Sequence, residues 1–388
     1  MPGEVFFSDL RTKMGHNLLD KIHSLMEALE PGKRIKKRGL TAIKIHFGER
    51  GNTSFIRPLL VRPVVDVVVK AGGKPFLTDA NTLYVGSRGN AVDHLNTALL
   101  NGFSPSVVGA PLIIADGIDG KDETGVRVDL KHFDQVYIGN AVAQAPNLIS
   151  LAHFKLHEMS GFGGAIKNVG MGAASRRGKM AQHCDVAPSV KPKLCVGCGA
   201  CLEACAHGAI ELIDREAKAD PAAKPGKKPV PKKLARTNPE RCVGCGACVH
   251  TCPNGAIQID WGKDLPPFME RMVEYTVGAV KGKENHSLFL NFLMQITPAC
   301  DCYPNSDAPI APDIGILAAT DPVAIDQASM DLLNAQAGLP SSCLKPEACL
   351  SGSDKVRAVY PHIQWEHQME YAEKVGLGSR SYNLVRIK

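Results

Sequence analysis

Apolar positions recur with two different periods along the chain, and segments of the two kinds follow one another. Residues 40–47 alternate apolar and polar side chains, which is typical of a strand, whereas residues 15–29 repeat apolar side chains at helical spacing. By the same criteria, further helices are predicted at residues 58–71, 90–100, 264–280, 321–337 and 361–375, and further strands at residues 75–78, 111–115, 126–130, 135–138, 147–152, 287–297, 313–318 and 382–387.

This alternation of strands with helices predicts an α/β fold, with a mostly parallel sheet and flanking helices. In such sheets, ligands bind beyond the carboxyl ends of the strands. Several polar side chains fall where predicted strands end, and we expect them to share that edge of the sheet: His46, Asp79, Asp116 and His153.

A cysteine-rich segment interrupts this alternation, which returns after it. We therefore predict one α/β domain formed by residues 1–188 and 261–388, with a smaller α+β domain inserted at residues 189–260. The insertion contains a Lys- and Pro-rich stretch at residues 215–236, whose composition predicts a loop without regular structure. The alternative is two separate α/β domains that flank the insertion.

Two copies of one cysteine spacing lie in the insertion and hold eight of the 13 cysteines. Each copy reads C-x2-C-x2-C-x3-C, the bacterial iron–sulfur run, in which the fourth cysteine ligates the other cluster. Glycines between the cysteines let the backbone curl around a cluster and direct N–H groups at its sulfurs. We therefore predict two [4Fe–4S] clusters, one held by Cys195, Cys198, Cys201 and Cys252, and the other by Cys242, Cys245, Cys248 and Cys205.

Two other interpretations of these cysteines are weaker. Structural zinc does not call for four cysteines in each run, and reduced core cysteines would not repeat a glycine-punctuated register. The insertion resembles a two-cluster bacterial-type ferredoxin, and the resemblance implies an inserted ferredoxin-like fold. Cys252 is followed by Pro253, as in that family, whereas Cys205 is followed by Ala206, which loosens the turn without removing a ligand.

The charge of the chain is concentrated in one place. The net charge is +6, and residues 215–241 alone hold nine Lys or Arg and three Asp or Glu, so the rest is neutral. This basic stretch predicts either a solvated tether or a segment that steers an acidic redox partner protein. A neutral domain and an aromatic content of 5% speak against nucleic acid.

The cellular setting also follows from the sequence. No run of 18 apolar residues and no signal peptide is present, so we expect a cytoplasmic protein without a membrane span. Cysteines in such a protein indicate metal and not disulfides. Exposed [4Fe–4S] clusters usually do not tolerate oxygen, so we expect an anaerobic or microaerobic host.

A second candidate site follows the predicted strand at residues 147–152. Three ionisable residues come first and are candidate catalytic groups: His153, Lys155 and His157. A glycine-rich segment follows, and its N–H groups together with a lysine suit an anion. Its candidate binding residues are Gly163, Gly164 and Lys167, to which we add Arg57 in the loop after residues 40–47. The alternative is a tight crossover whose polar residues are solvated.

A third metal is a further prediction. Cys300 and Cys302 lie at the end of another predicted strand, and with His183 and Cys184 they form a set that suits zinc or iron. The alternative is two reduced cysteines in a tight turn. A lone histidine such as His46 is more often a hydrogen-bonded loop residue than a ligand.

Several motifs outside the cysteine runs resemble one family. The residues are Lys44 to Glu49, Gly51 to Pro58, Leu77 to Gly86, His153 to Glu158, Gly161 to Asn168, and the pair Cys300 and Cys302. Together they resemble the iron–sulfur centre proteins of the domain-of-unknown-function 362 (DUF362) family, over nearly the whole chain. That family has no settled reaction to carry over. A weaker likeness to the amino-terminal domain of lactate racemase-type proteins is a hint at the level of the fold.

Two functions are consistent with these features. The first is an iron–sulfur redox protein, possessing a site in the α/β domain for a small anionic substrate or metal cofactor, where histidines supply protons near neutral pH. This function makes the protein an oxidoreductase. The second is a non-enzymatic ferredoxin-like electron carrier or assembly module, whose α/β domain docks a protein partner.

Overall fold

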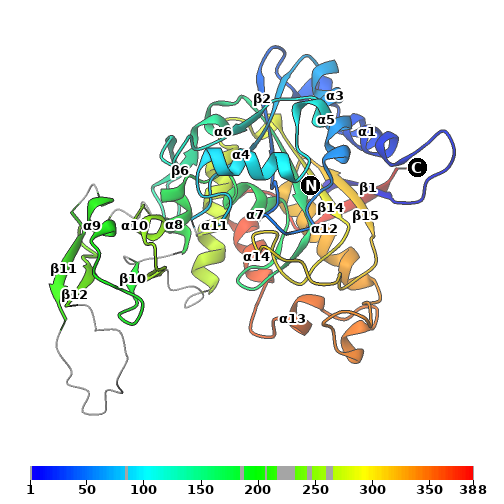
Figure 1. The fold of residues 1–388 in the computed structure, drawn as a ribbon. Helices are drawn as coiled ribbons and strands as arrows, with labels where there is room; N and C mark the ends of the chain where they lie inside the picture. Colours follow the sequence, from blue (N-terminus) through cyan, green and yellow to red (C-terminus); the bar gives the residue numbers. More distant parts are fainter. Residues whose placement is uncertain are drawn as a thin grey trace.

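One eight-stranded sheet forms the centre of the larger part of the molecule (Figure 1). The computed structural model describes residues 2–83, 86–183, 188–205, 208–215, 232–242, 247–258 and 265–387. Across the sheet the strands are β16 (Tyr382–Arg386), β1 (Gly3–Asp9), β15 (Gly315–Ala319), β14 (Ser287–Leu293), β7 (Asn147–His153), β2 (Leu40–Ile45), β3 (Lys74–Asp79) and β4 (Leu112–Ile114).

The sheet is mostly parallel, as the sequence predicts. Only β15 runs against its neighbours β1 and β14, and the other adjacent strands pair in parallel. β7 and β14 lie on opposite sides of the insertion in the sequence, yet Leu148 pairs with Ser287 in register. Two separate α/β domains would not share a sheet in this way, so that alternative is wrong.

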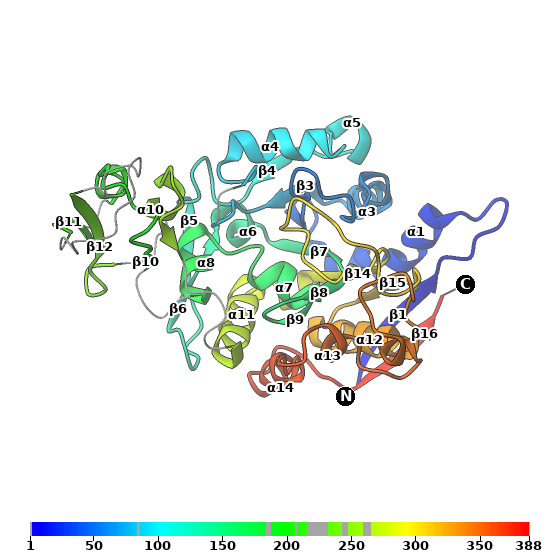
Figure 2. The ribbon, with the colours of Figure 1, turned by 60° about the horizontal axis from the view of Figure 1, so that its bottom comes forward.

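Helices cover both faces of the sheet (Figure 2). One face packs against α1, α3 and α4, and the other against α7 and α12, on which α11 and α14 pack in turn. The helices of the larger part are α1 (Leu18–Ala28), α2 (Pro31–Arg34), α3 (Arg62–Lys70), α4 (Ala91–Leu100), α5 (Pro105–Val108), α6 (Asn140–Gln144), α7 (Ala165–Gly170), α8 (Arg176–His183), α11 (Leu265–Val280), α12 (Pro322–Ala335), α13 (Lys355–Val359) and α14 (Glu366–Lys374), with short 3-10 helices at Pro58–Val61, Glu284–His286 and Pro346–Cys349.

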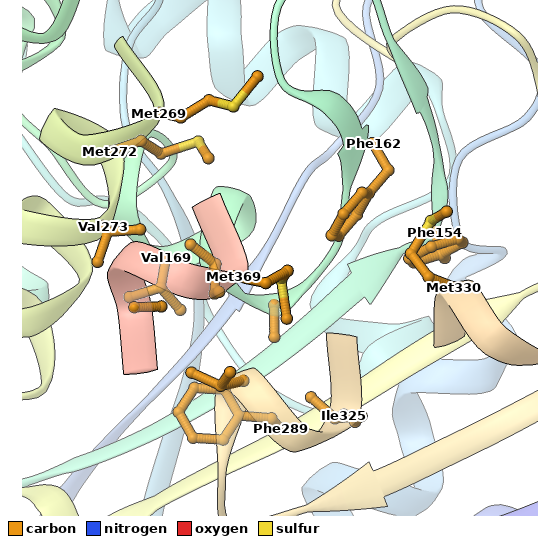
Figure 3. Close-up of a cluster of buried hydrophobic side chains, with 14 of the residues drawn as sticks. Phe154, Phe162, Val169, Met269, Met272, Val273, Phe289, Ile325, Met330 and Met369 are labelled. Carbon is orange, nitrogen blue, oxygen red and sulfur yellow. The ribbon is translucent and has the colours of Figure 1, made fainter. Parts of the chain in front are cut away.

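The side chains of successive residues in the inner strands belong to different hydrophobic cores, because the side chains of a strand alternate between its two faces. In β14, Phe289 belongs to the core under α7 and α12, whereas Leu288 and Leu290 belong to the core under α1 and α3. Figure 3 shows part of the first core, which Phe289 and Ile325 share with Met269 and Met272 of α11 and Met369 of α14. Strands buried on both faces are typical of a parallel sheet between helices.

Three local features differ from the sequence prediction. The strands predicted at residues 126–130 and 135–138 form a separate antiparallel hairpin, β5 (Glu123–Arg127) with β6 (Gln135–Gly139). A second hairpin joins β8 (Lys155–His157) to β9 (Gly161–Gly163). The glycine-rich segment after it forms α7 and α8, which were not predicted because glycine lowers helix propensity.

The cysteine segment forms a small unit beside the larger part (Figure 1). It has two short antiparallel pairs of strands and two short helices that pack on each other. Its elements are β10 (Ser189–Val190), α9 (Ala200–Glu203), β11 (Ile210–Asp214), β12 (Lys233–Thr237), α10 (Ala247–Thr251) and β13 (Ile257–Gln258). Within the described ranges, no helix has the length and apolar character needed to cross a membrane.

Candidate functional sites at the cysteine runs and the sheet edge

The two cysteine runs lie 47 positions apart in the sequence, and their described residues form equivalent elements. Cys195 of the first copy corresponds to Cys242 of the second, and α9 corresponds to α10. The copies exchange strands: β10 of the first pairs with β13 of the second, and β11 pairs with β12. This exchange carries the end of the second run towards the start of the first.

A pocket of about 330 Å³ lies where the two copies meet. Its lining includes all four residues that the sequence assigns to one cluster: Cys195, Cys198, Cys201 and Cys252. The apolar side chains of Leu212 and Ile257 line it as well. The fold therefore places Cys252 beside the first run, although 57 positions separate it from Cys195.

Backbone N–H groups donate to sulfur at equivalent positions of the two copies. Ala256 N–H donates to Cys252 Sγ at 3.2 Å, and Ala209 N–H donates to Cys205 Sγ at 3.2 Å. Such donors stabilise negative charge on sulfur, and at cluster sites they tune the reduction potential. The fourth cysteine of each run thus accepts the same kind of backbone hydrogen bond at its sulfur.

The thiol groups of the pocket are close enough to affect one another. Burial raises the pKa of Cys201, and the neighbouring charges of Cys252 and Cys195 raise it further. Ala235 N–H donates to Cys195 Sγ at 3.5 Å and offsets only part of such charge. Clustered thiolates repel one another, and bound metal relieves that repulsion. The donor set therefore fits a cationic inorganic group.

The second predicted cluster site is only partly described. Cys245 lies outside the described residues. Cys242 N–H donates to the carbonyl oxygen of Asn238 at 3.1 Å, and Cys248 and Cys205 are half-buried. The second cluster stays a prediction that rests on the repeat.

The carboxyl edge of the central sheet holds a second group of buried polar residues around Asp301. His153 Nδ1 lies 2.8 Å from Asp301 Oδ1, and Lys155 Nζ lies 3.2 Å from Asp301 Oδ2. His153 Nε2 lies 2.9 Å from the carbonyl oxygen of Met294. Although burial opposes it, the neighbouring His153 and Lys155 side chains hold the pKa of Asp301 well below its usual range. His153 and Lys155 are thereby fixed in place by a residue that the sequence did not single out.

The two cysteines that flank Asp301 approach each other closely. Cys300 Sγ lies 2.9 Å from Cys302 Sγ, Lys167 Nζ lies 3.5 Å from Cys300 Sγ, and His46 Nε2 lies 3.7 Å from Cys302 Sγ. A hydrogen bond from Cys300 is the largest cause that lowers the pKa of Cys302 well below its ordinary value, and His46 and Lys167 contribute. The pKa of Cys300 is raised well above its ordinary value by the same bond and by burial.

His46 is a functional candidate that the sequence analysis set aside. Its Nδ1 accepts the Gly48 N–H at 2.9 Å, which leaves Nε2 facing Cys302. Burial lowers the pKa of His46, so the ring is neutral at pH 7 and carries its proton on Nε2. The signal available in the sequence was its position at the end of β2, the edge to which ligands bind in parallel sheets.

Two of the candidate histidines, His157 and His183, have lowered pKa values. Burial and the nearby charge of Lys167 hold the pKa of His157 well below its usual range. Burial, together with His157 and Lys167, lowers the pKa of His183 to about 3. His157 Nδ1 accepts the N–H groups of Met159 and Ser160, both at 3.2 Å. Both rings are therefore neutral at pH 7.

The glycine-rich segment serves close packing at two of its predicted anion-binding positions. A Cβ on Gly163 would lie 3.3 Å from both Lys155 Cε and Lys167 Cδ, so this glycine lets the two lysines approach. A Cβ on Gly164 would lie 2.3 Å from Asp326 Oδ1. The first two N–H groups of α7 donate to the Asp326 carboxylate, so these donors are already engaged within the protein.

Arg57 lines a second pocket, which lies in the α/β part of the molecule. The volume of this pocket is about 270 Å³, and His153, Met294 and Gln295 line it as well. On the neighbouring strands, Lys44 Nζ lies 2.9 Å from Asp79 Oδ1, and the pair is almost fully buried. This ion pair joins β2 to β3 near their carboxyl ends.

The predicted third metal site is not assembled in the part of the chain that the structure describes. There, no three His, Cys, Asp or Glu side chains form a group that could hold a metal ion. Cys184 lies outside the described residues, and the His183 ring stacks on Phe268. The third metal stays a prediction. A four-iron cluster poses a different requirement, because each thiolate bonds its own iron.

The comparison with protein families decides the family. Residues 41–331 match the model described as Domain of unknown function (DUF362). The chain belongs to the DUF362 family. The matched range extends across the cysteine segment and includes the sheet-edge residues from His46 to Cys302. The membership of the DUF362 family that the sequence predicts is therefore confirmed, whereas iron–sulfur binding and the ferredoxin-like insertion stay predictions.

Comparisons with curated proteins and with solved structures add little to this family assignment. The comparison with curated proteins gave no match. Among solved structures, the lactate racemase apoprotein from Thermoanaerobacterium thermosaccharolyticum aligns with a TM-score of 0.33 and 17% identity, and the match covers 46% of this chain and 41% of the racemase chain. This chain thus spans less than half the length of that neighbour, and no argument is based on the likeness.

Proposed function

We propose that this chain is an iron–sulfur redox protein that holds two [4Fe–4S] clusters in a ferredoxin-like insertion and exchanges electrons with a site at the sheet edge. The observation that carries the proposal is the pocket where Cys195, Cys198 and Cys201 meet Cys252. Four cysteine ligands, amide groups that donate to sulfur and an apolar lining are typical of sites that hold such clusters. A [4Fe–4S] cluster supplies one-electron transfer when bound.

The sheet edge supplies positive charge for a small anionic substrate. Lys155 and Lys167 both approach Gly163, and Lys155 is buried whereas Lys167 is half-buried. Although burial opposes it, the thiols Cys300 and Cys302 raise the pKa of Lys167, so its ammonium group stays charged at pH 7. Buried cations bind an anion more strongly than surface cations, because water screens them less. A metal cofactor at the cysteine pair is the other ligand consistent with these side chains.

A second function, a non-enzymatic electron carrier, has one observation in its favour. Cys198 is exposed, and three apolar side chains near it are also exposed: Leu194, Val196 and Leu202, at 44%, 49% and 41%. An apolar surface beside a cluster suits contact with a redox partner protein. The buried charges at the sheet edge have no role in this second function, which is why we favour the first.

The crossed ligand assignment gives the sharpest test. Replacing Cys252 by Ser should remove the cluster that the first run holds, although Cys252 belongs to the second run. We expect anaerobically purified Cys252→Ser protein to lose about four of eight irons and to change its electron paramagnetic resonance spectrum after reduction. Cys343→Ser, at an exposed cysteine outside both runs, should keep all its iron. Full iron content in Cys252→Ser would contradict the assignment.

A further inference from the structure

The Cys300–Cys302 pair has the geometry of a reactive dithiol. Its sulfur atoms are 2.9 Å apart, and a disulfide bond needs about 2.05 Å. An approach of about 1 Å is therefore enough to join them. The pair lies in the part of the molecule where parallel strands end, and it shares no residue with the two cysteine runs.

Asp301, which lies between the two cysteines, is held in place by contacts with other segments of the chain. The carboxylate of Asp301 contacts His153 and Lys155. The carbonyl oxygen of Asp301 accepts the Glu49 N–H at 3.1 Å. These contacts fix Asp301, the middle residue of the loop, and thereby restrict the movement of the two flanking cysteines.

The two sulfurs differ in access and in their polar neighbours. Cys300 is 2% exposed, whereas Cys302 is half-buried and precedes the exposed residues 303–305. Lys167 Nζ faces Cys300 at 3.5 Å, and His46 Nε2 faces Cys302 at 3.7 Å. A cation and an N–H donor beside a thiol favour its thiolate form, which is the attacking species in thiol–disulfide exchange. Cys302 is therefore the sulfur that a substrate can reach, and Cys300 is the one behind it.

We propose that Cys300 and Cys302 form a redox-active dithiol that reduces a small disulfide, with Cys302 as the attacking and Cys300 as the resolving cysteine. Cys302 Sγ bonds to one substrate sulfur, and the other leaves as a thiolate that takes up a proton. Cys300 Sγ then bonds to Cys302 Sγ, and the second substrate sulfur leaves and is protonated. One substrate disulfide becomes two thiols, and the cysteine pair loses two electrons and two protons.

This step deepens the proposed function by naming a substrate class for the sheet-edge site, and it does not depend on the clusters. Its competitor is the predicted third metal, for which the same two sulfurs would serve as ligands. The two differ in their chemistry. A metal-bound pair resists exchange and releases metal when mutated, whereas a free dithiol exchanges and releases none.

The test uses oxidised glutathione on anaerobically purified protein, followed by alkylation of free thiols and mass spectrometry of the peptides. In the wild type we expect a Cys300–Cys302 disulfide without a glutathione adduct. In Cys300→Ser the resolving thiol is absent, so a mixed disulfide should accumulate on Cys302, about tenfold faster than on the exposed Cys343. In Cys302→Ser the buried Cys300 should form no glutathione adduct. Cys343→Ser should behave as the wild type.

Two results would overturn the dithiol. One is Cys300→Ser protein in which Cys302 stays free while Cys343 is modified. The other is one zinc, iron or nickel per chain, beyond the iron of the clusters, that is lost when either cysteine of the pair is replaced. Iron content is measured on the same samples, so a failed exchange with full iron overturns the dithiol and leaves the iron–sulfur proposal standing.

Discussion

At the scale of single residues, Asp301 has the largest structural role at the sheet edge. It is fully buried, and its carboxylate faces two nitrogen atoms, His153 Nδ1 and Lys155 Nζ. Its place between two cysteines gave no hint of this role, because a sequence shows neighbours along the chain and not across it. The lysine and histidine were predictable from their position after a strand, but their common partner was not.

Asp301→Asn should destabilise the protein strongly. The change removes the negative charge and leaves two buried nitrogen bases without a charged partner, which costs about 3–5 kcal/mol. Urea denaturation of the anaerobic protein measures the free energy of unfolding. The control is Asp307→Asn, since Asp307 is exposed on the same loop and caps only its own turn. Equal unfolding midpoints for the two variants would show that Asp301 has no such role.

At the scale of elements, α7 is the helix that links the glycine-rich segment to the core. It packs against α11 so closely that a Cβ on Gly170 would lie 2.2 Å from the carbonyl oxygen of Met272. Its first N–H groups are capped from α12 by Asp326, at 2.7 Å and 2.9 Å. The sequence showed the glycines but not the reason for them, because close helix packing depends on a partner more than 100 positions away.

Gly170→Ala tests the close approach of α7 and α11. The added methyl group would meet the backbone of Met272 and the hydroxyl of Thr276, so the helices must move apart, which costs about 1–3 kcal/mol or more. Gly32→Ala is the matched control, because Gly32 is in helix α2 with nothing within 4 Å of the added atom. There, alanine should leave stability unchanged or raise it by up to about 1 kcal/mol. Thermal unfolding of both variants checks the difference, and a similar loss in both would refute the packing argument.

Asp326 should make stability depend on pH. Burial raises its pKa to about 6, above the value of about 3.9 in an unfolded chain. The folded state therefore binds the proton more tightly, and the stabilisation from this proton is lost as pH rises through about 6. Asn does not titrate. The free energy of unfolding of the wild type, minus that of Asp326→Asn, should fall by about 1 kcal/mol between pH 5 and pH 7. A difference that is constant or rises over this range would contradict the raised pKa.

At the scale of the whole molecule, the sequence predicted the architecture better than the sites. Periodicity gave the parallel strands and their helices, because both buried faces leave a clear apolar pattern. It did not give the reversed direction of β15, since an apolar strand reads the same in either direction. The cysteine spacing predicted that Cys252 joins the first run, which the exchange of β10 and β13 makes feasible. His46 was set aside because only the fold brings it to the cysteine pair, and Asp301 was missed because only the fold brings it to His153 and Lys155.

The iron and acid-labile sulfide content of anaerobically purified wild-type protein tests the central claim most directly. Two four-iron clusters per chain predict about eight irons and eight sulfides, with electron paramagnetic resonance signals of reduced clusters after dithionite. Zinc in place of iron, or protein without sulfide despite anaerobic handling throughout, would contradict the account.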